Sequence, residues 1–314
     1  MDPGTGRLTF KEEVGLGGGP GPIAVDPNRS YMHIGIRSSC EIASYRINPE
    51  TGGLSALGTV SLDADPCYMF VDRTGKFLLS SYYNAGKVTV HRISEGGAAG
   101  ERIVEMATAE HAHCVQTDRS NRFAFVPHTV PPNTVFQFLF DAETGKLTPN
   151  SVAKVTRPAG EGPRHFVFHP HRDLVYVSNE NGSSVTAYRF DSGSGRLTDF
   201  QTLSTLPEGY SGENTCAQIH MTPNGGMLFV SNRGHDTIAC YAIDEHTGLM
   251  TPLGQQKTQP IPRVFCVDPT GEFLYAAGQG SGKMEAFRID ENAGSLISLE
   301  VYDVGKRPMW VMVL

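Results

Sequence analysis

Val267-Asp268-Pro269-Thr270-Gly271-Glu272-Phe273 is the stretch of sequence that decides the fold. It reads as the apolar end of one strand, a tight Asp-Pro turn closed by glycine, and the aromatic start of the next strand. The same frame recurs six times, and we call its first turn residue the anchor. The anchors are separated by 46, 46, 51, 53 and 46 residues, at Asp26, Asp72, Asp118, His169, Thr222 and Asp268.

Each repeat has the strand content of one β-propeller blade. Five residues after the anchor comes an aromatic or large apolar residue, as at Tyr31 and Phe77, and about nineteen residues after the anchor comes a third apolar strand, such as 43–47. A turn such as Thr51-Gly52 leads into a fourth strand. Periods near 46 exclude ankyrin and tetratricopeptide arrays, whose repeats are about 33 or 34 residues long and helical.

The two ends of the chain supply parts of one further repeat. Residues 305–314 resemble another first strand, and residues 2–8 resemble the turn that leads into another fourth strand. The sequence therefore predicts a single all-β domain over residues 1–314, a seven-bladed β-propeller whose seventh blade is incomplete. About twenty residues for its second and third strands are absent, so we expect a fragment or a misassigned start.

Composition narrows the class of function. The chain has 26 Lys and Arg against 33 Asp and Glu, and a net charge of −7 disfavours nucleic acid as a partner. No apolar run reaches the roughly 18 residues of a membrane span, and the first ten residues lack signal-peptide features, so we expect a cytoplasmic protein. The six cysteines form no C-x-x-C pair and are interpreted as reduced core thiols.

Candidate functional residues gather where first strands begin and second strands end, because these positions share one edge of a blade. Symmetry about the turn pairs Arg164 with Glu180 and Arg263 with Gln279. This edge is basic, which predicts a pocket for carboxylate or phosphate groups. Its residues are Arg37, Tyr83, Asn84, His111, His113, His128, Arg164, His165, Glu180, Arg233, Arg263, Gln279 and Trp310.

Two chemical roles remain open from the residues alone. Glu180 is a candidate general base, or a partner that only holds Arg164 in place. His111 and His113 share a strand face, but no third ligand converges on them, so we expect no metal. A phosphate-binding loop and a G-x-S-x-G elbow are absent, and no Cys-His pair is placed to suggest a covalent nucleophile.

Several long motifs resemble those of the seven-bladed lactonase propellers, the family that includes bacterial 6-phosphogluconolactonase and the fungal carboxy-muconate cyclases. The resemblance covers nearly the whole chain and is closest to the bacterial branch. Its most specific pieces are residues 81–86, 161–170, 219–223, 276–279 and 305–310.

The resemblance implies a metal-free hydrolase for 6-phosphogluconolactone in the pentose phosphate route, with His113, Arg164, Glu180 and Arg233 as catalytic residues. It also implies that the protein uses no organic cofactor. Glu180 would activate water, or His113 if Arg164 holds the glutamate too tightly. The remaining candidates would bind a small anionic sugar lactone, with the phosphate on Arg37 or Arg263. These substrate-binding candidates are Arg37, Tyr83, Asn84, His165, Arg263, Gln279 and Trp310.

Two alternatives belong to other classes. The first is lactonisation of a carboxy-muconate, because the two reactions share these residue positions. The second is a protein-binding propeller, which the missing WD signature and the clustering of charge at one edge disfavour. We expect a monomer or a weak homodimer, with no nucleic acid and no membrane as partner.

Overall fold

The computed structural model describes all 314 residues and contains twenty-four β-strands and no α-helix. No helical segment of the kind that crosses a membrane is therefore present. The strands form six four-stranded antiparallel sheets, each joined in chain order, as the six repeats predict. The chain divides into two compact units, Met1–Glu12 with Gly160–Asp191 and Leu197–Leu314, and Glu13–Ala159 with Ser192–Arg196. A single domain over residues 1–314 stays a prediction.

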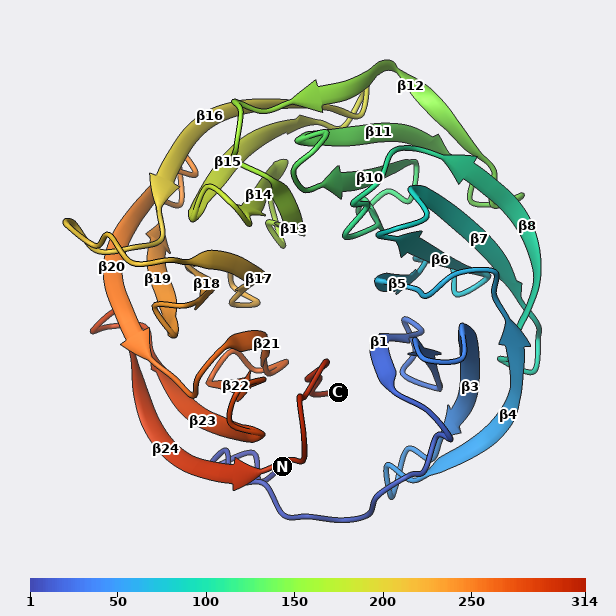
Figure 1. The fold of residues 1–314 in the computed structure, drawn as a ribbon, viewed down its shortest axis with the longest axis horizontal. Coiled ribbons are helices and arrows are strands. Elements are labelled where there is room, and N and C mark those ends of the chain that lie inside the picture. The colour runs from blue at the N-terminus through green and yellow to red at the C-terminus, as the bar shows by residue number, and fades with distance from the viewer. The chain divides into compact units, whose positions relative to one another are not determined.

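The unit that carries both termini holds three of the sheets (Figure 1). The first runs β13 (Pro163–Phe168), β14 (Leu174–Asn179), β15 (Ser184–Asp191) and β16 (Arg196–Ser204). The second runs β17 (Thr215–Met221), β18 (Met227–Arg233), β19 (Thr237–Ile243) and β20 (Met250–Lys257). The third runs β21 (Pro262–Val267), β22 (Phe273–Gly278), β23 (Lys283–Asp290) and β24 (Ser295–Asp303).

The other unit holds the remaining three sheets. The first runs β1 (Pro20–Val25), β2 (Tyr31–Ile36), β3 (Glu41–Ile47) and β4 (Leu54–Ser61). The second runs β5 (Tyr68–Val71), β6 (Phe77–Tyr82), β7 (Lys87–Ile93) and β8 (Ala99–Ala107). The third runs β9 (Gln116–Thr117), β10 (Phe123–His128), β11 (Thr134–Phe140) and β12 (Leu147–Thr156).

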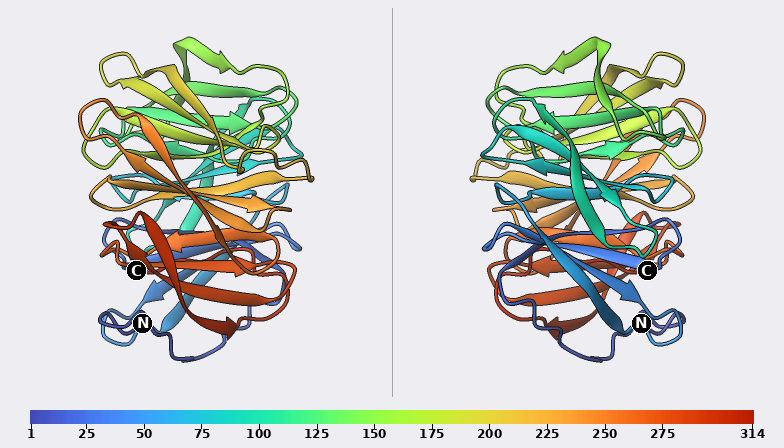
Figure 2. Two further views of the ribbon diagram at one scale, coloured as in Figure 1. Left: turned by 90° about the vertical axis from the view of Figure 1, so that its left-hand side faces the viewer. Right: turned by 90° about the vertical axis from the view of Figure 1, so that its right-hand side faces the viewer.

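The second strand of a sheet is its most buried element. Every residue of β14 and of β22 is buried, whereas β24 alternates between exposed and partly buried residues. The strands of each sheet twist strongly, so the fourth strand is steeply inclined to the first (Figure 2). Apolar side chains of consecutive sheets meet face to face, as in the cluster that joins Tyr176 of β14 to Leu228 of β18. The core therefore lies between sheets rather than within one.

Five of the six anchors close the turn between the first and second strands with a pair of hydrogen bonds, and His169 keeps the main-chain bond of this pair. The amide of Asp268 donates to the carbonyl of Phe273 at 2.9 Å, and the amide of Phe273 donates to the Asp268 carboxylate at 2.7 Å. The hydroxyl of Thr222 accepts from the amide of Met227 in the same way, at 3.0 Å. A side-chain oxygen at this position thus satisfies an amide that the tight turn leaves open.

In several sheets a glycine in the turn before the fourth strand locks the sheet to the one before it. A Cβ atom on Gly97 would lie 2.1 Å from the ring of Tyr31, and one on Gly145 would lie 2.8 Å from the ring of Phe77. Both glycines have positive φ angles, 86° and 75°. The backbone must therefore lie directly on the ring, which only glycine permits at this spacing.

The terminal segments contain no strand but occupy positions of a seventh blade beside the β21–β24 sheet. Gly6 lies against the ring of Phe273 as Gly97 lies against Tyr31, and the Tyr275 hydroxyl donates to the Gly6 carbonyl at 2.7 Å. Val311 and Val313 pack on the same apolar cluster. Six complete blades and an incomplete seventh agree with the sequence prediction.

Acid should destabilise this fold through its buried histidines. Burial lowers the pKa of His33, His91, His128 and His220 from 6.5 to about 4. Because the unfolded chain binds these protons first, stability is lost as the pH falls from 6.5 towards 4, by up to about 3 kcal/mol for each histidine. Denaturant unfolding at pH 7, 5.5 and 4.5 measures this loss.

His33 offers the most direct control, because its Nε2 atom is buried without a hydrogen-bond partner. His33→Gln should reduce the dependence of the unfolding free energy on pH between 7 and 4.5, even where it lowers that energy at pH 7. An unchanged slope in His33→Gln would contradict the assignment.

Candidate active site

Two positions of the repeat supply the candidate site residues. The first lies five residues before the anchor, ahead of or at the start of the first strand, and the second lies eleven residues after the anchor, where the second strand ends. The first position holds Gly21, Cys67, His113, Arg164, Ala217 and Arg263. The second position holds Arg37, Tyr83, Thr129, Glu180, Arg233 and Gln279.

A bulge in the first strand brings these two positions together. The sequence prediction that Arg164 and Glu180 are cross-strand partners is wrong by one residue, because His165 pairs with Ser178, and Pro163 with Asn179 across a shift of register. Arg263 sits at the same irregularity between Pro262 and Val264. A bulge redirects the side chain of its extra residue, which is a common feature beside functional sites.

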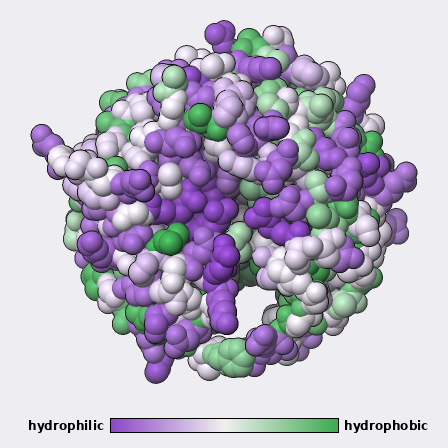
Figure 3. All heavy atoms as spheres, in the orientation of Figure 1, coloured by the Kyte–Doolittle hydropathy of each residue, from purple (hydrophilic) through white to green (hydrophobic).

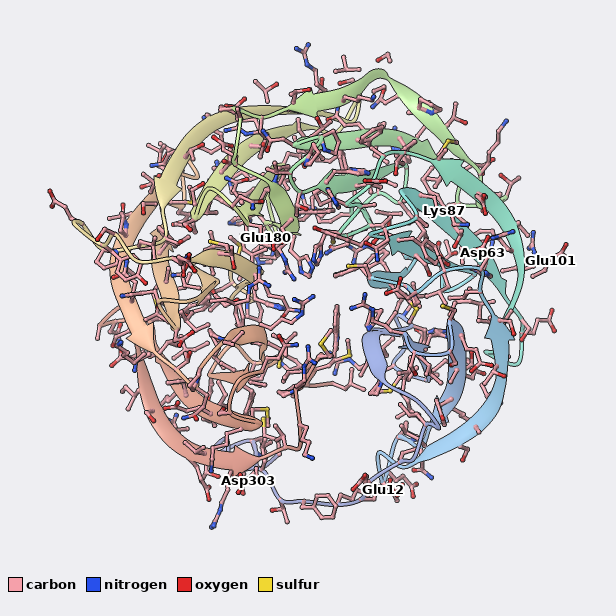
Figure 4. The ribbon with its side chains drawn as sticks, viewed as in Figure 1. Glu12, Asp63, Lys87, Glu101, Glu180 and Asp303 are labelled. Atoms are coloured by element: carbon pink, nitrogen blue, oxygen red, sulfur yellow. The ribbon has the colours of Figure 1, made fainter.

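Glu180 lies between two arginines in the unit that carries the termini. The Oε2 atom of Glu180 is 2.9 Å from Nε of Arg164, and Nη2 of Arg233 donates to Oε1 at 2.8 Å. The Arg164 side chain is only 2% exposed, against 19% for Glu180. Glu180 is labelled in Figure 4, where it lies among nitrogen-bearing side chains.

Backbone contacts hold this cluster in place. The amide of Cys216 donates to the carbonyl of Glu180 at 2.9 Å, and the carbonyl of Cys216 accepts from Nη2 of Arg233 at 3.0 Å. The start of β17 thus connects the end of β14 to a side chain from the end of β18. Arg233 is fixed through one nitrogen, and its buried Nε has no hydrogen-bond partner within the protein.

The cluster keeps Glu180 ionised. Burial alone would raise the pKa of this carboxyl, but the charges of Arg164 and Arg233 outweigh burial and lower the pKa below its usual 4.5. A carboxylate held in this way is a weak proton acceptor at neutral pH. The geometry therefore favours Glu180 as the partner that holds the arginines, one of the two interpretations that the sequence left open.

Arg263 and His165 belong to the same cluster. The charge of Arg263 also acts on Glu180 and on His165. Burial, together with the charges of Arg164 and Arg263, lowers the pKa of His165 well below 6.5, so its ring is neutral. The charges of three arginines thus act on the carboxylate of Glu180.

The other unit brings Tyr83, His111, His113 and Thr129 together. The ring of Tyr83 lies 4.6 Å from that of His111 and 5.5 Å from that of His113, measured between centroids. The hydroxyl of Thr129 donates to the Tyr83 hydroxyl at 3.3 Å. Neighbouring second-strand ends therefore meet here as they do at Glu180 and Arg233. The catalytic role of His113 stays a prediction.

A thiol that the sequence analysis set aside also lies in this cluster. The Sγ atom of Cys67 is 3.6 Å from Nδ1 of His113. The expectation that no Cys-His pair is placed to suggest a covalent nucleophile did not foresee this contact. The two residues occupy the same position in consecutive repeats, 46 residues apart, and this equal spacing is the signal that could have identified the contact.

The remaining candidates have varied surroundings. Arg37 forms an ion pair with Asp65, through Nη2 and through Nε at 3.0 Å, so its charge is already neutralised. Sequence reasoning missed Asp65, which stands two residues before Cys67. Asn84 is exposed.

Gln279 lies near the C-terminal segment. Its side-chain amide contacts Sδ of Met309 at 3.0 Å, and the residue after Met309 is the partly buried Trp310.

The surface near the cluster is polar. Hydrophilic side chains gather over β13 and β17 on the face shown in Figure 3. The structure contains no group of three or more His, Cys, Asp or Glu side chains placed to hold a metal ion. The chemistry of the cluster is thus that of guanidinium donors and one carboxylate, which can bind and polarise an anionic oxygen substrate.

Six four-stranded antiparallel sheets joined in chain order define a β-propeller. The chain belongs to the family described as lactonase, 7-bladed beta-propeller, which matches residues 1–313. The family that the sequence motifs predicted is therefore confirmed.

The sequences of two named relatives align with nearly the whole chain. A 6-phosphogluconolactonase from Pectobacterium carotovorum is 37% identical over 309 residues, covering 98% of this chain and 92% of the relative. One from Yersinia pestis is 35% identical over 308 residues, covering 98% and 91%.

Solved structures share the fold. A periplasmic gluconolactonase from Pseudomonas aeruginosa superposes with a TM-score of 0.84 at 24% identity, covering 91% of this chain and 86% of that one. A putative 6-phosphogluconolactonase from Bacteroides fragilis has the same TM-score and identity, with 93% and 86% covered.

Neutralising Glu180 should destabilise the protein. Glu180→Gln leaves the buried Arg164 without its counter-charge, and breaking such a buried pair costs about 3 to 5 kcal/mol. The matched control is Asp303→Asn, which removes the carboxylate of an exposed pair with Lys283, side chains 86% and 45% exposed. That change should cost at most about 1 kcal/mol in the free energy of unfolding. Equal losses in urea unfolding would contradict this account of Glu180.

Proposed function

We propose that this chain hydrolyses 6-phospho-glucono-1,5-lactone to 6-phosphogluconate. The observation that carries the proposal is the cluster of Arg164, Arg233 and Arg263 around the single carboxylate of Glu180, in a protein whose net charge is −7. A phosphorylated lactone brings both a phosphate and a carbonyl oxygen that becomes anionic during attack by water. The names of the Pectobacterium and Yersinia relatives support this substrate.

Arg233 is assigned to the oxyanion of the tetrahedral intermediate. Its Nη2 is held by Glu180 and by the Cys216 carbonyl, while its Nε–H has no acceptor in the protein. A donor that is fixed in direction before the reaction stabilises developing charge without reorganisation. Arg164 supports this arrangement by holding the other oxygen of Glu180.

The base is assigned to His113. Glu180 is the weaker of the two candidates, because two arginines lower its pKa and occupy both of its oxygens. A base that accepts a proton from water works best when its pKa lies near the working pH, which suits an imidazole. Glu180 then acts as a positioning residue for Arg164 and Arg233.

The phosphate is assigned to Arg263 rather than to Arg37. Arg37 is paired with Asp65, whereas the charge of Arg263 acts on Glu180 together with those of Arg164 and Arg233. A cytoplasmic location belongs to the same proposal, since phosphorylated sugars are charged and do not cross membranes freely. Cell fractionation tests that part.

The kinetics of two variants should separate the base from the positioning carboxylate. His113→Asn should lower kcat by about 10²- to 10⁴-fold, the usual contribution of a general base. It should also remove the acid limb of the pH profile of kcat/KM, because the group that must lose a proton is gone. Glu180→Gln should lower kcat while keeping that limb. If Glu180→Gln lost the acid limb of the pH profile and His113→Asn kept it, the general base would be Glu180 and the assignment to His113 would be wrong.

Substrate preference tests the arginine assignment. A pH-stat assay, corrected for spontaneous hydrolysis, should show faster turnover of 6-phosphogluconolactone than of gluconolactone. Arg263→Ala should remove that preference and Arg37→Ala should leave it. Inorganic phosphate should compete, and more weakly as salt rises. Equal rates on both lactones, or turnover of a carboxy-muconate only, would contradict the proposed substrate.

A further inference from the structure

Cys67 and His113 form a thiol–imidazole pair whose sulfur has no part in the proposed hydrolysis of a lactone. Sγ of Cys67 lies 3.6 Å from Nδ1 of His113. The backbone fixes both residues: the Cys67 amide donates to the Ser81 carbonyl at 2.8 Å, and the His113 amide donates to the Pro127 carbonyl at 3.0 Å. The pair is therefore part of the fold rather than a contact between mobile side chains.

The two partners differ in their access to solvent. His113 is only 5% exposed and lies against the edge of the Tyr83 ring, whereas Cys67 is partly exposed. Cys67 is thus the more accessible residue of the pair. An imidazole within hydrogen-bond distance favours the thiolate, which is the reactive form of cysteine.

The other five cysteines lack this combination. Cys114, Cys216, Cys240 and Cys266 are buried, and burial raises the pKa of the last three thiols to about 12. Cys40 is partly exposed like Cys67, but its Sγ contacts a backbone carbonyl, that of Arg37, at 3.8 Å. Cys40 is therefore a matched control of similar exposure without an imidazole partner.

We propose that Cys67 is a modification site for electrophiles that react with thiolates, and that a group attached there inhibits the enzyme by displacing His113. The inhibitory part rests on the proposed function, in which His113 is the base. The reactivity of Cys67 does not, since it depends only on the pair itself.

Iodoacetamide serves as the probe, and its reaction is a simple displacement. Nδ1 of His113 takes the thiol proton, and the Cys67 thiolate attacks the methylene carbon of the reagent. A carbon–sulfur bond forms as the carbon–iodine bond breaks, and iodide leaves with the bonding pair. The imidazolium then returns its proton to water.

Peptide mass spectrometry of the full chain should show Cys67 labelled at least about tenfold faster than Cys40. His113→Asn and His113→Gln should slow labelling of Cys67 to the rate of Cys40, whereas His111→Asn, which alters the neighbouring ring, should change it less than twofold. The four buried cysteines should stay unlabelled in every variant, because iodoacetamide would reach them only if the variant were unfolded. A Cys67 rate within threefold of Cys40 in the unaltered protein would overturn the proposal without any variant.

Activity distinguishes the two parts of the proposal. In Cys67→Ser, the activity that remains should resist iodoacetamide, while the parent protein should lose activity at the rate at which Cys67 is labelled. Full activity after complete labelling of Cys67 would overturn the inhibitory role. If the chain hydrolyses none of the lactones tested, the proposed function fails, but the labelling ratio still decides whether Cys67 is activated.

Discussion

The hydrogen bond from the anchor amide to the carbonyl five residues later is the interaction on which the rest of the structure depends, and all six anchors form it. It closes a tight turn between the first and second strands, so that residues sixteen apart in sequence, such as Arg164 and Glu180, lie at one edge. At five of the anchors a side-chain oxygen also accepts from the amide five residues later. At His169 the side chain instead accepts from the amide of His171, while the backbone bond to Leu174 remains. The turn therefore tolerates a change of side chain as long as its main-chain bond is kept.

In the basic cluster, the carboxylate of Glu180 balances the charges of Arg164 and Arg233, and these two arginines in turn keep the carboxylate ionised. A guanidinium as buried as that of Arg164 is expensive to remove from water, and Glu180 offsets that cost only because Arg233 holds the carboxylate from its other side. The same geometry that makes the cluster possible lowers the pKa of Glu180. Structural support and proton acceptance are thus competing demands on one carboxylate.

The sequence predicted the blades well, because period, turn chemistry and strand alternation are local signals. It also identified Arg164 and Glu180 as neighbours, although their register is off by one, since a bulge leaves no trace in residue spacing. The contact of Cys67 with His113 and the pairing of Arg37 with Asp65 were not foreseen. Both depend on how adjacent sheets pack, which no single repeat encodes.

The glycine lock has a consequence for how such a chain can grow. One repeat carries both halves of the contact, a turn glycine for the sheet before it and a ring for the sheet after it, as Gly97 and Phe77 do within a single repeat. A repeat produced by tandem duplication of about 46 residues would therefore already carry a turn glycine that fits the ring of the original repeat. The copy could dock on its original before any residue had diverged, and diversification could then act on the strand ends alone.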